Sequence, residues 1–406
     1  MSSTPRGERL NIAIIGKRNA GKSSLINALV GQEIAIVSDV PGTTTDPVDK
    51  RYELLPLGPV TFFDTAGVDD TGELGEKRIQ ATQKILYRTD IAIFVSDGNA
   101  FNNAELKMIE KIREMELPML IVFNKKDIIP ASQENIAFCQ KYSLPYISVS
   151  SVTKEGIDEC KEKLIQLSPK YLKENRIIAG DLVEPKNSVI LVTPIDTSAP
   201  KGRLILPQVQ TLRDLLDRNC LVTVVQETEL KSALEKTKEP PSLVITDSQV
   251  IEMVAKIVPE EIPLTTFSIL FARYKGELDI LLEGINRLKT LQDGDKILIA
   301  EACSHHIQKD DIGRVKIPNW MQKFSQKNLS FEVYAGHDFP ENLEEYAVCI
   351  HCGGCMITPM EMNRKIMECC RRSVPVTNYG MTISLLKGVL DRTINPLLKA
   401  KVKQTQ

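Results

Sequence analysis

The sequence predicts an α/β protein built from parallel sheets in three successive blocks. From Asn11 onward, short apolar runs alternate with amphipathic stretches, as strands and helices do in a sheet covered by helices. A glycine-rich loop, GKRNAGKS, separates the first apolar run from the first amphipathic stretch. The same alternation returns twice, and the third block holds most of the cysteines.

The bulk properties fit a globular chain of several domains. Its 406 residues are enough for two or three domains, and 42% of them are hydrophobic and 26% charged, as in ordinary globular proteins. A net charge of −2 argues against nucleic acid as the main partner. The first residues lack the apolar core of a signal peptide, and no apolar run is long enough to span a bilayer. We therefore expect a cytoplasmic protein without membrane contact.

The first block is expected to form a domain over residues 8–172. The runs NIAIIG, VTFFDT, IAIFVSD, MLIVFNKKD and YISVSS are predicted strands, and KSSLINALVG and NAELKMIEKIREME are predicted helices. LSPKYLKENR is expected to close the domain as a helix and linker. Each strand ends in a polar or glycine-containing loop, so ligands are expected at the carboxyl ends of the strands.

Two further α/β domains are expected at residues 183–262 and 264–396. In the second block SVILVTPI, LVTVVQ and SLVIT are predicted strands, and the absence of clustered chemical groups indicates a structural or interface role. In the third block TTFSILFARYK, DKILIAEA, LSFEVYAG and YAVCIHC are predicted strands. LDILLEGINRLKT and TPMEMNRKIMECCRRS are predicted helices, the latter begun by Thr358 and Pro359.

The loop from Gly16 to Ser23 matches the phosphate-binding P-loop in its required context between a strand and a helix. Its backbone N–H groups and the helix amino terminus surround phosphate oxygens. Lys22 adds a positive charge, and the Ser23 hydroxyl can bind Mg²⁺. The nucleotide-binding candidates here are Gly16, Asn19, Ala20, Gly21, Lys22, Ser23 and Ser24.

Three later segments favour GTP over ATP. In DTAG, Asp64 can hold Mg²⁺ through water, and the Gly67 N–H can meet the γ-phosphate. In NKKD, Asp127 can accept both guanine donors that adenine lacks, while Asn124 can meet the N7 and O6 side of the ring. SVSSV lies where a backbone N–H would contact guanine O6. The further nucleotide-binding candidates are Asp64, Gly67, Asn124, Lys125, Asp127, Ser150 and Ser151.

This ordered set of motifs resembles the translation-factor class of GTPases, especially its tRNA-modification and ribosome-assembly branch. The resemblance implies that GTTTD is the first switch, with Thr44 binding Mg²⁺, and that Lys22, Thr44 and Gly67 serve hydrolysis. Asn19 lies where potassium-activated relatives bind K⁺, which would offset charge that develops between the phosphates. Val68 replaces the water-orienting glutamine of Ras-like enzymes. We therefore expect slow hydrolysis that a monovalent cation activates.

Soft metal ligands gather in the last quarter of the chain. Six of the nine cysteines and all four histidines follow residue 300. Cys303 and His305 form C-x-H, and His351, Cys352 and Cys355 belong to H-C-G-G-C. Three thiolates with a weaker fourth ligand suit an iron–sulfur cluster with one labile iron or a Cys₃His zinc site, and the residues alone leave both open. The remaining cysteines of this region, Cys349, Cys369 and Cys370, are expected to be small buried residues.

Over its full length the chain resembles the HydF family, the GTPase maturation factors of FeFe-hydrogenases. The resemblance implies that Cys303, Cys352 and Cys355 hold a 4Fe–4S cluster, with His305 and His351 at or beside an exchangeable fourth position.

The resemblance also implies a homodimer formed by the second block. As a scaffold, it would receive a transient di-iron precursor made with two radical-SAM maturases and deliver it to apo FeFe-hydrogenase. The alternative from the residues is a ribosome- or tRNA-directed regulatory GTPase stapled by zinc.

Overall fold

The computed structural model divides the chain into two compact units, residues 1–175 and 176–406, which we describe separately. The described residues are 6–31, 49–54, 58–65, 82, 84–169, 176–194, 204–302, 311–336 and 339–405.

The first unit is built on a six-stranded sheet of order β2-β3-β1-β4-β5-β6. All neighbouring strands are parallel except β2 and β3, which form an antiparallel pair. Its elements are β1 (Leu10–Gly16), α1 (Lys22–Val30), β2 (Asp49–Leu54), β3 (Gly58–Asp64), β4 (Ile91–Ser96), α3 (Asn103–Glu114), β5 (Met119–Phe123), α4 (Gln133–Lys141), β6 (Tyr146–Ser148) and α5 (Ile157–Leu167). The sheet is the one expected from the alternating sequence pattern.

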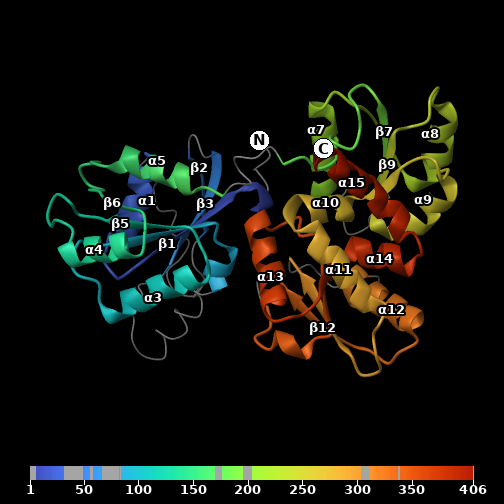
Figure 1. Cartoon of the computed structure of the whole chain (residues 1–406). Coiled ribbons are helices and arrows are strands. Elements are labelled where there is room, and N and C mark those ends of the chain that lie inside the picture. Colours follow the sequence, from blue (N-terminus) through green and yellow to red (C-terminus); the bar gives the residue numbers. More distant parts are fainter. Residues whose placement is uncertain are drawn as a thin grey trace, which may run out of the picture. The chain divides into compact units, whose positions relative to one another are not determined.

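Helices cover both faces of this sheet (Figure 1). The apolar sides of α1 and α5 pack on one face, and those of α3 and α4 pack on the other. The strands β4 and β5 are buried along their whole length, as central parallel strands are. The chemistry of this unit is therefore confined to the loops at the strand ends.

The second unit contains two four-stranded parallel sheets. The first has the order β10-β9-β7-β8. Its elements are β7 (Ser188–Val192), α7 (Leu206–Asp217), β8 (Leu221–Val225), α8 (Leu230–Lys236), β9 (Leu243–Thr246), α9 (Ile251–Ile257), β10 (Leu264–Thr266) and α10 (Phe267–Lys275). The strand β8 lies at the edge, and its side chains are largely exposed.

The other sheet of this unit has the order β12-β11-β13-β14. Its elements are α11 (Leu278–Leu288), β11 (Lys296–Glu301), α12 (Ile317–Ser325), β12 (Ser330–Ala335), β13 (Val348–His351), α13 (Pro359–Arg371), β14 (Val376–Asn378), α14 (Tyr379–Leu386) and α15 (Leu390–Thr405). One continuous hydrophobic core extends through both sheets of the unit. Among the described residues, no helix combines the length and the apolar character that a bilayer crossing needs.

The segment TTFSILFARYK was predicted to be a strand, but most of it is a helix. Leu264–Thr266 is a short strand that pairs with β9, and Phe267–Lys275 is the helix α10. The Thr266 hydroxyl accepts a hydrogen bond from the Ile269 N–H at 3.2 Å and so caps the helix. A short apolar run satisfies either period, so the tertiary pairing decides between them. The expected domain bounds stay a prediction.

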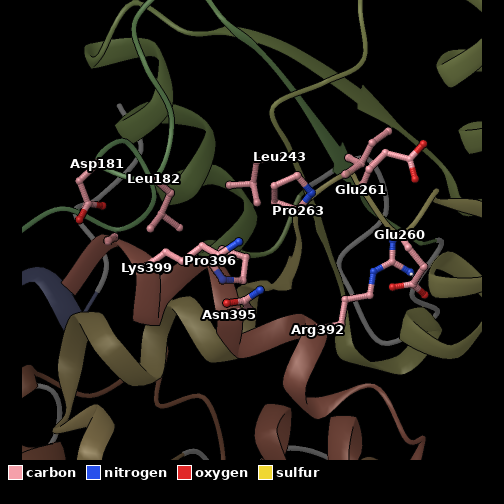
Figure 2. A pocket seen from close by; sticks show the side chains of 12 residues that line it. Asp181, Leu182, Leu243, Glu260, Glu261, Pro263, Arg392, Asn395, Pro396 and Lys399 are labelled. Atoms are coloured by element: carbon pink, nitrogen blue, oxygen red, sulfur yellow. Dashed lines mark hydrogen bonds and ion pairs between the residues drawn. The ribbon is translucent and has the colours of Figure 1, made fainter. Parts of the chain in front are cut away.

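A cavity of about 240 Å³ lies in the second unit between the first of its sheets and α15. Figure 2 shows the Arg392 side chain of α15 beside Glu260 at this cavity. The Arg392 guanidinium also donates to the carbonyl oxygens of Ala255 and Val258, at 2.9 and 2.8 Å. These bonds attach α15 to α9 and to the loop between α9 and β10. The lining residues include none of the metal candidates.

Candidate functional site

The phosphate loop connects the end of β1 to the start of α1, as predicted. A Cβ atom on Gly16 would lie 2.1 Å from the Val95 carbonyl oxygen of β4, so only glycine allows the two strands to approach this closely. Gly21 and Asn19 have φ angles of 92° and 61°. These left-handed residues turn the chain, so that the backbone enters α1 at Lys22. The resulting helix start offers N–H groups to an anion.

Two candidate magnesium ligands are already in contact. The Ser23 hydroxyl donates to the Asp64 carboxylate at 2.9 Å, across the ends of α1 and β3. The Lys22 ammonium donates to the Gly16 and Lys17 carbonyl oxygens at 3.0 and 2.9 Å. A hydroxyl, a carboxylate and an ammonium are thus gathered at one end of the sheet. These groups can bind a divalent cation and a polyphosphate.

Asn124 joins the phosphate loop to the loop after β6. Its amide nitrogen donates to the Ala20 carbonyl oxygen at 3.1 Å. Its amide oxygen accepts from the N–H and the hydroxyl of Ser151, at 3.1 and 2.9 Å. The side chain is only 2% exposed, so breaking these bonds would leave buried polar groups unpaired. This geometry makes Asn124 a clamp between two loops, and its predicted contact with the guanine ring stays a prediction.

Asp127 lies in the loop that follows β5. Its side chain is exposed, and within the described residues no hydrogen bond or ion pair is recorded for its carboxylate. The neighbouring Lys125 adopts a left-handed φ of 62°, and the Lys126 N–H donates to the Val149 carbonyl oxygen at 3.0 Å. Ser150 is buried, and its hydroxyl accepts from the Thr153 N–H at 3.1 Å. The loops after β5 and β6 are therefore bound to each other beside an accessible carboxylate.

Four of the predicted site residues lie outside the described parts of the chain. Thr44 and Gly67 were expected to contact Mg²⁺ and the γ-phosphate, and Cys303 and His305 were expected at the metal site. Val68 and the first-switch segment also fall outside. Their predicted roles stay predictions.

The strands that precede the two halves of the cysteine motif in the sequence are neighbours in the sheet. β11 and β13 pair in parallel, with Ala300 opposite His351. The Ala302 N–H, one residue past the end of β11, donates to the Cys352 sulfur at 3.1 Å. The residue directly before Cys303 is therefore hydrogen-bonded to Cys352. The sequence predicted that Cys303 and Cys352 each follow a strand, where an open sheet places a ligand site. The two strands are confirmed, while Cys303 itself lies outside the described residues.

The CGGC segment forms a tight loop between β13 and α13. The Gly354 N–H donates to the Cys352 sulfur at 3.4 Å. Gly354 has a φ of 62°, and a Cβ atom there would lie 2.5 Å from the Met362 side chain. Burial raises the pKa of the Cys355 thiol, and the nearby Lys275 ammonium opposes that shift. The Cys352 sulfur thus accepts N–H groups from both Ala302 and Gly354, and hydrogen bonds of this kind tune a metal group that a sulfur binds.

His351 has the protonation state that a metal ligand needs. Its Nδ1 lies 2.8 Å from the Cys352 carbonyl oxygen, which can only accept, so Nδ1 carries the proton. Nε2 then holds a lone pair, and it is buried without a hydrogen-bond partner among the described residues. Burial and the charge of Lys365 lower the pKa of His351 to about 3. The imidazole is therefore neutral, and its donor atoms fit a metal group.

A lysine that the sequence analysis did not select also belongs to this site. Lys275, at the end of α10, donates through its ammonium to the carbonyl oxygens of Gly354, Cys355 and Ile357. In the sequence, Lys275 is a charged residue at the end of an apolar stretch. Surface lysines commonly occupy such positions, so nothing there indicated a buried lysine. Its burial became evident only with the folded chain.

The remaining cysteines of this region differ in their exposure. Cys349 and Cys369 are buried, as expected, but Cys370 is exposed on α13. Its burial was predicted wrongly because two adjacent residues on a helix surface cannot both face the same core. Within the described ranges no three His, Cys, Asp or Glu side chains form a metal-binding group.

Comparison with known families divides the chain into three matched segments. Residues 11–125 match the 50S ribosome-binding GTPase model. Residues 178–276 match the hydrogen maturase F dimerization domain, and residues 279–396 match the hydrogen maturase F tetramerization domain. The two hydrogen maturase F models together cover more than half of the chain.

Curated relatives match through the GTPase segment. The chain is 38% identical over 162 residues to a tRNA modification GTPase MnmE of Chromobacterium violaceum, covering 39% of this chain and 35% of that protein. It is 34% identical over 210 residues to a GTPase Der of Kosmotoga olearia, covering 48% and 46% of the two chains. The chain thus spans about a third to a half of the length of these relatives.

Among solved structures, the G domain of T. maritima FeoB is 25% identical, covers 39% of this chain and 99% of its own, and has a TM-score of 0.32. The first unit is a P-loop GTPase domain, and the chain belongs to the hydrogen maturase F (HydF) family.

Proposed function

We propose that the protein hydrolyses GTP in its first unit and carries an iron–sulfur cluster in its second. On this proposal it is a scaffold that holds a di-iron precursor and passes it to apo FeFe-hydrogenase. The observation that carries the proposal is the Ala302 N–H bond to the Cys352 sulfur, because it joins the strands of the two motif halves within a hydrogen maturase F domain. Precursor assembly with two radical-SAM maturases rests on the family alone.

For hydrolysis, the chain supplies positioning and charge. The N–H groups of the phosphate loop and the Lys22 ammonium would hold the phosphates, and Ser23, with Asp64 through water, would hold Mg²⁺, which supplies positive charge next to the phosphates. Thr44 would be a further Mg²⁺ ligand, and the Gly67 N–H would contact the γ-phosphate. Asp127 accepts the guanine donors, while Asn124 and Ser151 keep the base loops aligned with the phosphate loop.

Hydrolysis is slow without an activating cation. Val68 has no polar group to orient the attacking water, so the rate depends on charge stabilisation. Asn19 lies in the phosphate loop in a left-handed conformation and is the residue we assign to K⁺. GTP turnover in KCl should exceed turnover in NaCl at equal ionic strength, and Asn19→Ala should remove the difference. Equal rates in both salts would contradict this part of the proposal.

For the cluster, Cys303, Cys352 and Cys355 would be the ligands, with His305 and His351 at or beside the fourth position. The cluster would offer an iron with an exchangeable site to which a second metal complex attaches. The Ala302 and Gly354 N–H groups direct the Cys352 sulfur, and the neutral His351 presents a free lone pair. Such N–H contacts tune the properties of a sulfur-ligated group.

Self-association fits the exposed edge of the first sheet of the second unit. The edge strand β8 carries Leu221 and Val224, which are 64% and 40% exposed. An apolar edge strand is a template for pairing with another chain, and it lies in the matched dimerization domain. We therefore propose a homodimer formed through β8.

Metal analysis tests the cluster directly. After anaerobic reconstitution, the wild-type chain should contain about four iron and four sulfide per protomer, and Cys303→Ala and Cys352→Ala should lose the chromophore. Cys370→Ala is the matched control, because that cysteine is exposed and lies outside the motif. Stoichiometric zinc without iron would support the alternative of a zinc-stapled regulatory GTPase.

Delivery is tested by activation of apo FeFe-hydrogenase with protein that was co-expressed with the two maturases. Wild-type protein and Cys370→Ala should activate it, and Cys303→Ala should not. Full activation by Cys303→Ala would contradict the cluster assignment, whereas GTP turnover should persist in that variant.

The dimer surface has its own test. Leu221→Glu should shift the sedimentation of the protein toward the monomer, because side chains on paired strands lie side by side and the new charge would be packed against apolar side chains of the partner strand. Phe324→Glu is the control, since Phe324 is also exposed, at 45%, but lies on α12. An unchanged assembly in Leu221→Glu would exclude β8 as the interface.

A further inference from the structure

A buried lysine lies under the loop that carries Cys352 and Cys355. Lys275 is 1% exposed. Its ammonium donates to the carbonyl oxygens of Gly354 at 2.9 Å, Cys355 at 3.2 Å and Ile357 at 2.8 Å. A lysine ammonium has three N–H donors. All three therefore have an acceptor in the loop between β13 and α13.

These hydrogen bonds alone do not explain the choice of a charged group. Carbonyl oxygens accept equally well from neutral donors, and burial of an ammonium costs free energy. The cost is offset where negative charge gathers nearby. On the proposed function, Cys352 and Cys355 bind metal as thiolates on this same loop, so a positive charge beneath it opposes their combined negative charge.

The lysine also links the loop to the helix that follows the first sheet of the unit. α10 begins directly after β10 and packs against α7, α13 and α14. Near the start of α10, the Ser268 hydroxyl accepts from the Gly380 N–H at 3.1 Å, and a Cβ on Gly353 would lie 3.7 Å from that hydroxyl oxygen. The helix is thus held in place along the loop, so that the position of the ammonium is set by the packing of both sheets.

We propose that Lys275 is a positioning residue for the metal-binding thiolates: it fixes the backbone of the CGGC loop and places a positive charge against the thiolate-bound metal group. This inference rests on the proposed role of Cys352 and Cys355 in metal binding. It predicts that the affinity of the loop for a metal ion depends on Lys275 even when no cluster is present.

The probe is Co²⁺, titrated anaerobically into the full-length apoprotein and followed by its thiolate charge-transfer absorption. Lys275→Met should weaken Co²⁺ binding by about 10–100-fold, as loss of a group that supports metal ligands does. Lys289→Met, which removes an exposed charge after α11, should bind as the wild type does. Lys275→Arg keeps the charge and should lose less than about tenfold.

Wild-type affinity in Lys275→Met would overturn the inference. If Lys275→Met lacks a cooperative thermal transition, Lys275→Arg decides: near wild-type affinity supports the inference, and a tenfold or larger loss in the folded variant overturns it. In reconstituted protein the reduction potential should be lower in Lys275→Met than in the wild type, because a positive charge near the added electron has been removed.

The proposed function and this inference fail separately. Suppose that Co²⁺ binding is weaker in Lys275→Met than in the wild type, but the wild type never assembles iron and sulfide. This result would refute the proposed cluster and support the proposed role of Lys275. A wild-type chain with a cluster, and a Lys275→Met variant equal to it in Co²⁺ affinity and potential, would refute the lysine and support the cluster.

Discussion

The phosphate loop and the CGGC loop have similar backbone arrangements but are held in place by different kinds of side chain. Both lie after a parallel strand, contain a left-handed glycine and lead into a helix. The phosphate loop is held by a neutral amide, Asn124, and its charged groups are at least partly exposed. The CGGC loop is held by a buried charge, Lys275.

The difference follows from what each loop is proposed to bind. A nucleotide brings its own negative charge and leaves again, so the site keeps its cations accessible and its clamp neutral. A metal group held by thiolates gathers negative charge in the protein itself, so a buried cation beneath the loop is favourable. The steric limits differ too, because Gly16 faces backbone whereas Gly354 faces a flexible methionine.

The largest expected effect separates the two sites by function. Lys22→Ala should lower the rate of GTP hydrolysis by about 10²–10³-fold, because the cation that stabilises charge on the phosphates is removed. Iron content after reconstitution should be unchanged. Lys107→Ala, an exposed lysine on α3, is the control for charge. Loss of the cluster in Lys22→Ala would show that the two sites depend on each other.

The next effect compares the two glycines. Gly16→Ala should destabilise the first unit by about 3 kcal/mol, because its Cβ would overlap a backbone carbonyl that cannot move alone. Gly354→Ala should cost the second unit about 1–2 kcal/mol, mainly from its left-handed φ, since the Met362 side chain can shift.

The single tryptophan makes this comparison measurable. Trp320 lies on α12 of the second unit, so urea unfolding followed by its fluorescence reports that unit, while binding of a fluorescent GDP reports the first. Gly16→Ala should change only the unfolding followed by GDP binding, and Gly354→Ala should change only the unfolding followed by Trp320 fluorescence. A larger effect of Gly354→Ala would contradict the steric argument.

A smaller effect distinguishes the clamp from the base contact in the first unit. Asn124→Ala should lower both GTP affinity and the stability of the unit, because Ser151 and Ala20 lose their partner. Asp127→Ala should lower affinity by about 30-fold, or 2 kcal/mol, without a change in stability, since its carboxylate is exposed. Calorimetric titration with GDP and thermal unfolding check both, and equal stability losses would refute the distinction.

The smallest effect concerns the attachment of α15. Arg392→Met should destabilise the second unit by about 1–2 kcal/mol, because carbonyl oxygens of Ala255 and Val258 lose their donor. Arg213→Met is the control, since its ion pair with Asp217 is exposed and contributes little. The Trp320 fluorescence transition measures both, and an unchanged midpoint in Arg392→Met would exclude the clamp.

Local motifs were predictable where their residues are contiguous. The phosphate loop, the helix from Pro359 and the strands before Ala302 and Cys352 lie where the sequence indicated, because period, capping and glycine placement are local properties. The segment from Thr265 to Lys275 was predicted wrongly as a strand, since its apolar run fits more than one period.

Side-chain roles that depend on distant contacts were not predictable. The sequence did not indicate that the Asn124 amide holds together residues 20 and 151, in addition to its predicted contact with the base. Lys275 was not selected at all, because a lysine at the end of a helix is usually exposed, and only the loop some 80 residues later in the chain buries it.

By itself the sequence determined the α/β class, the phosphate loop and the two halves of the cysteine motif, because each is written in neighbouring residues or in a regular period. Only the tertiary structure decided that β11 and β13 are adjacent, that Asn124 is a clamp and that Lys275 supports the CGGC loop. The physical reason is that burial and long-range hydrogen bonds arise from the packing of whole sheets, which no short stretch of sequence records.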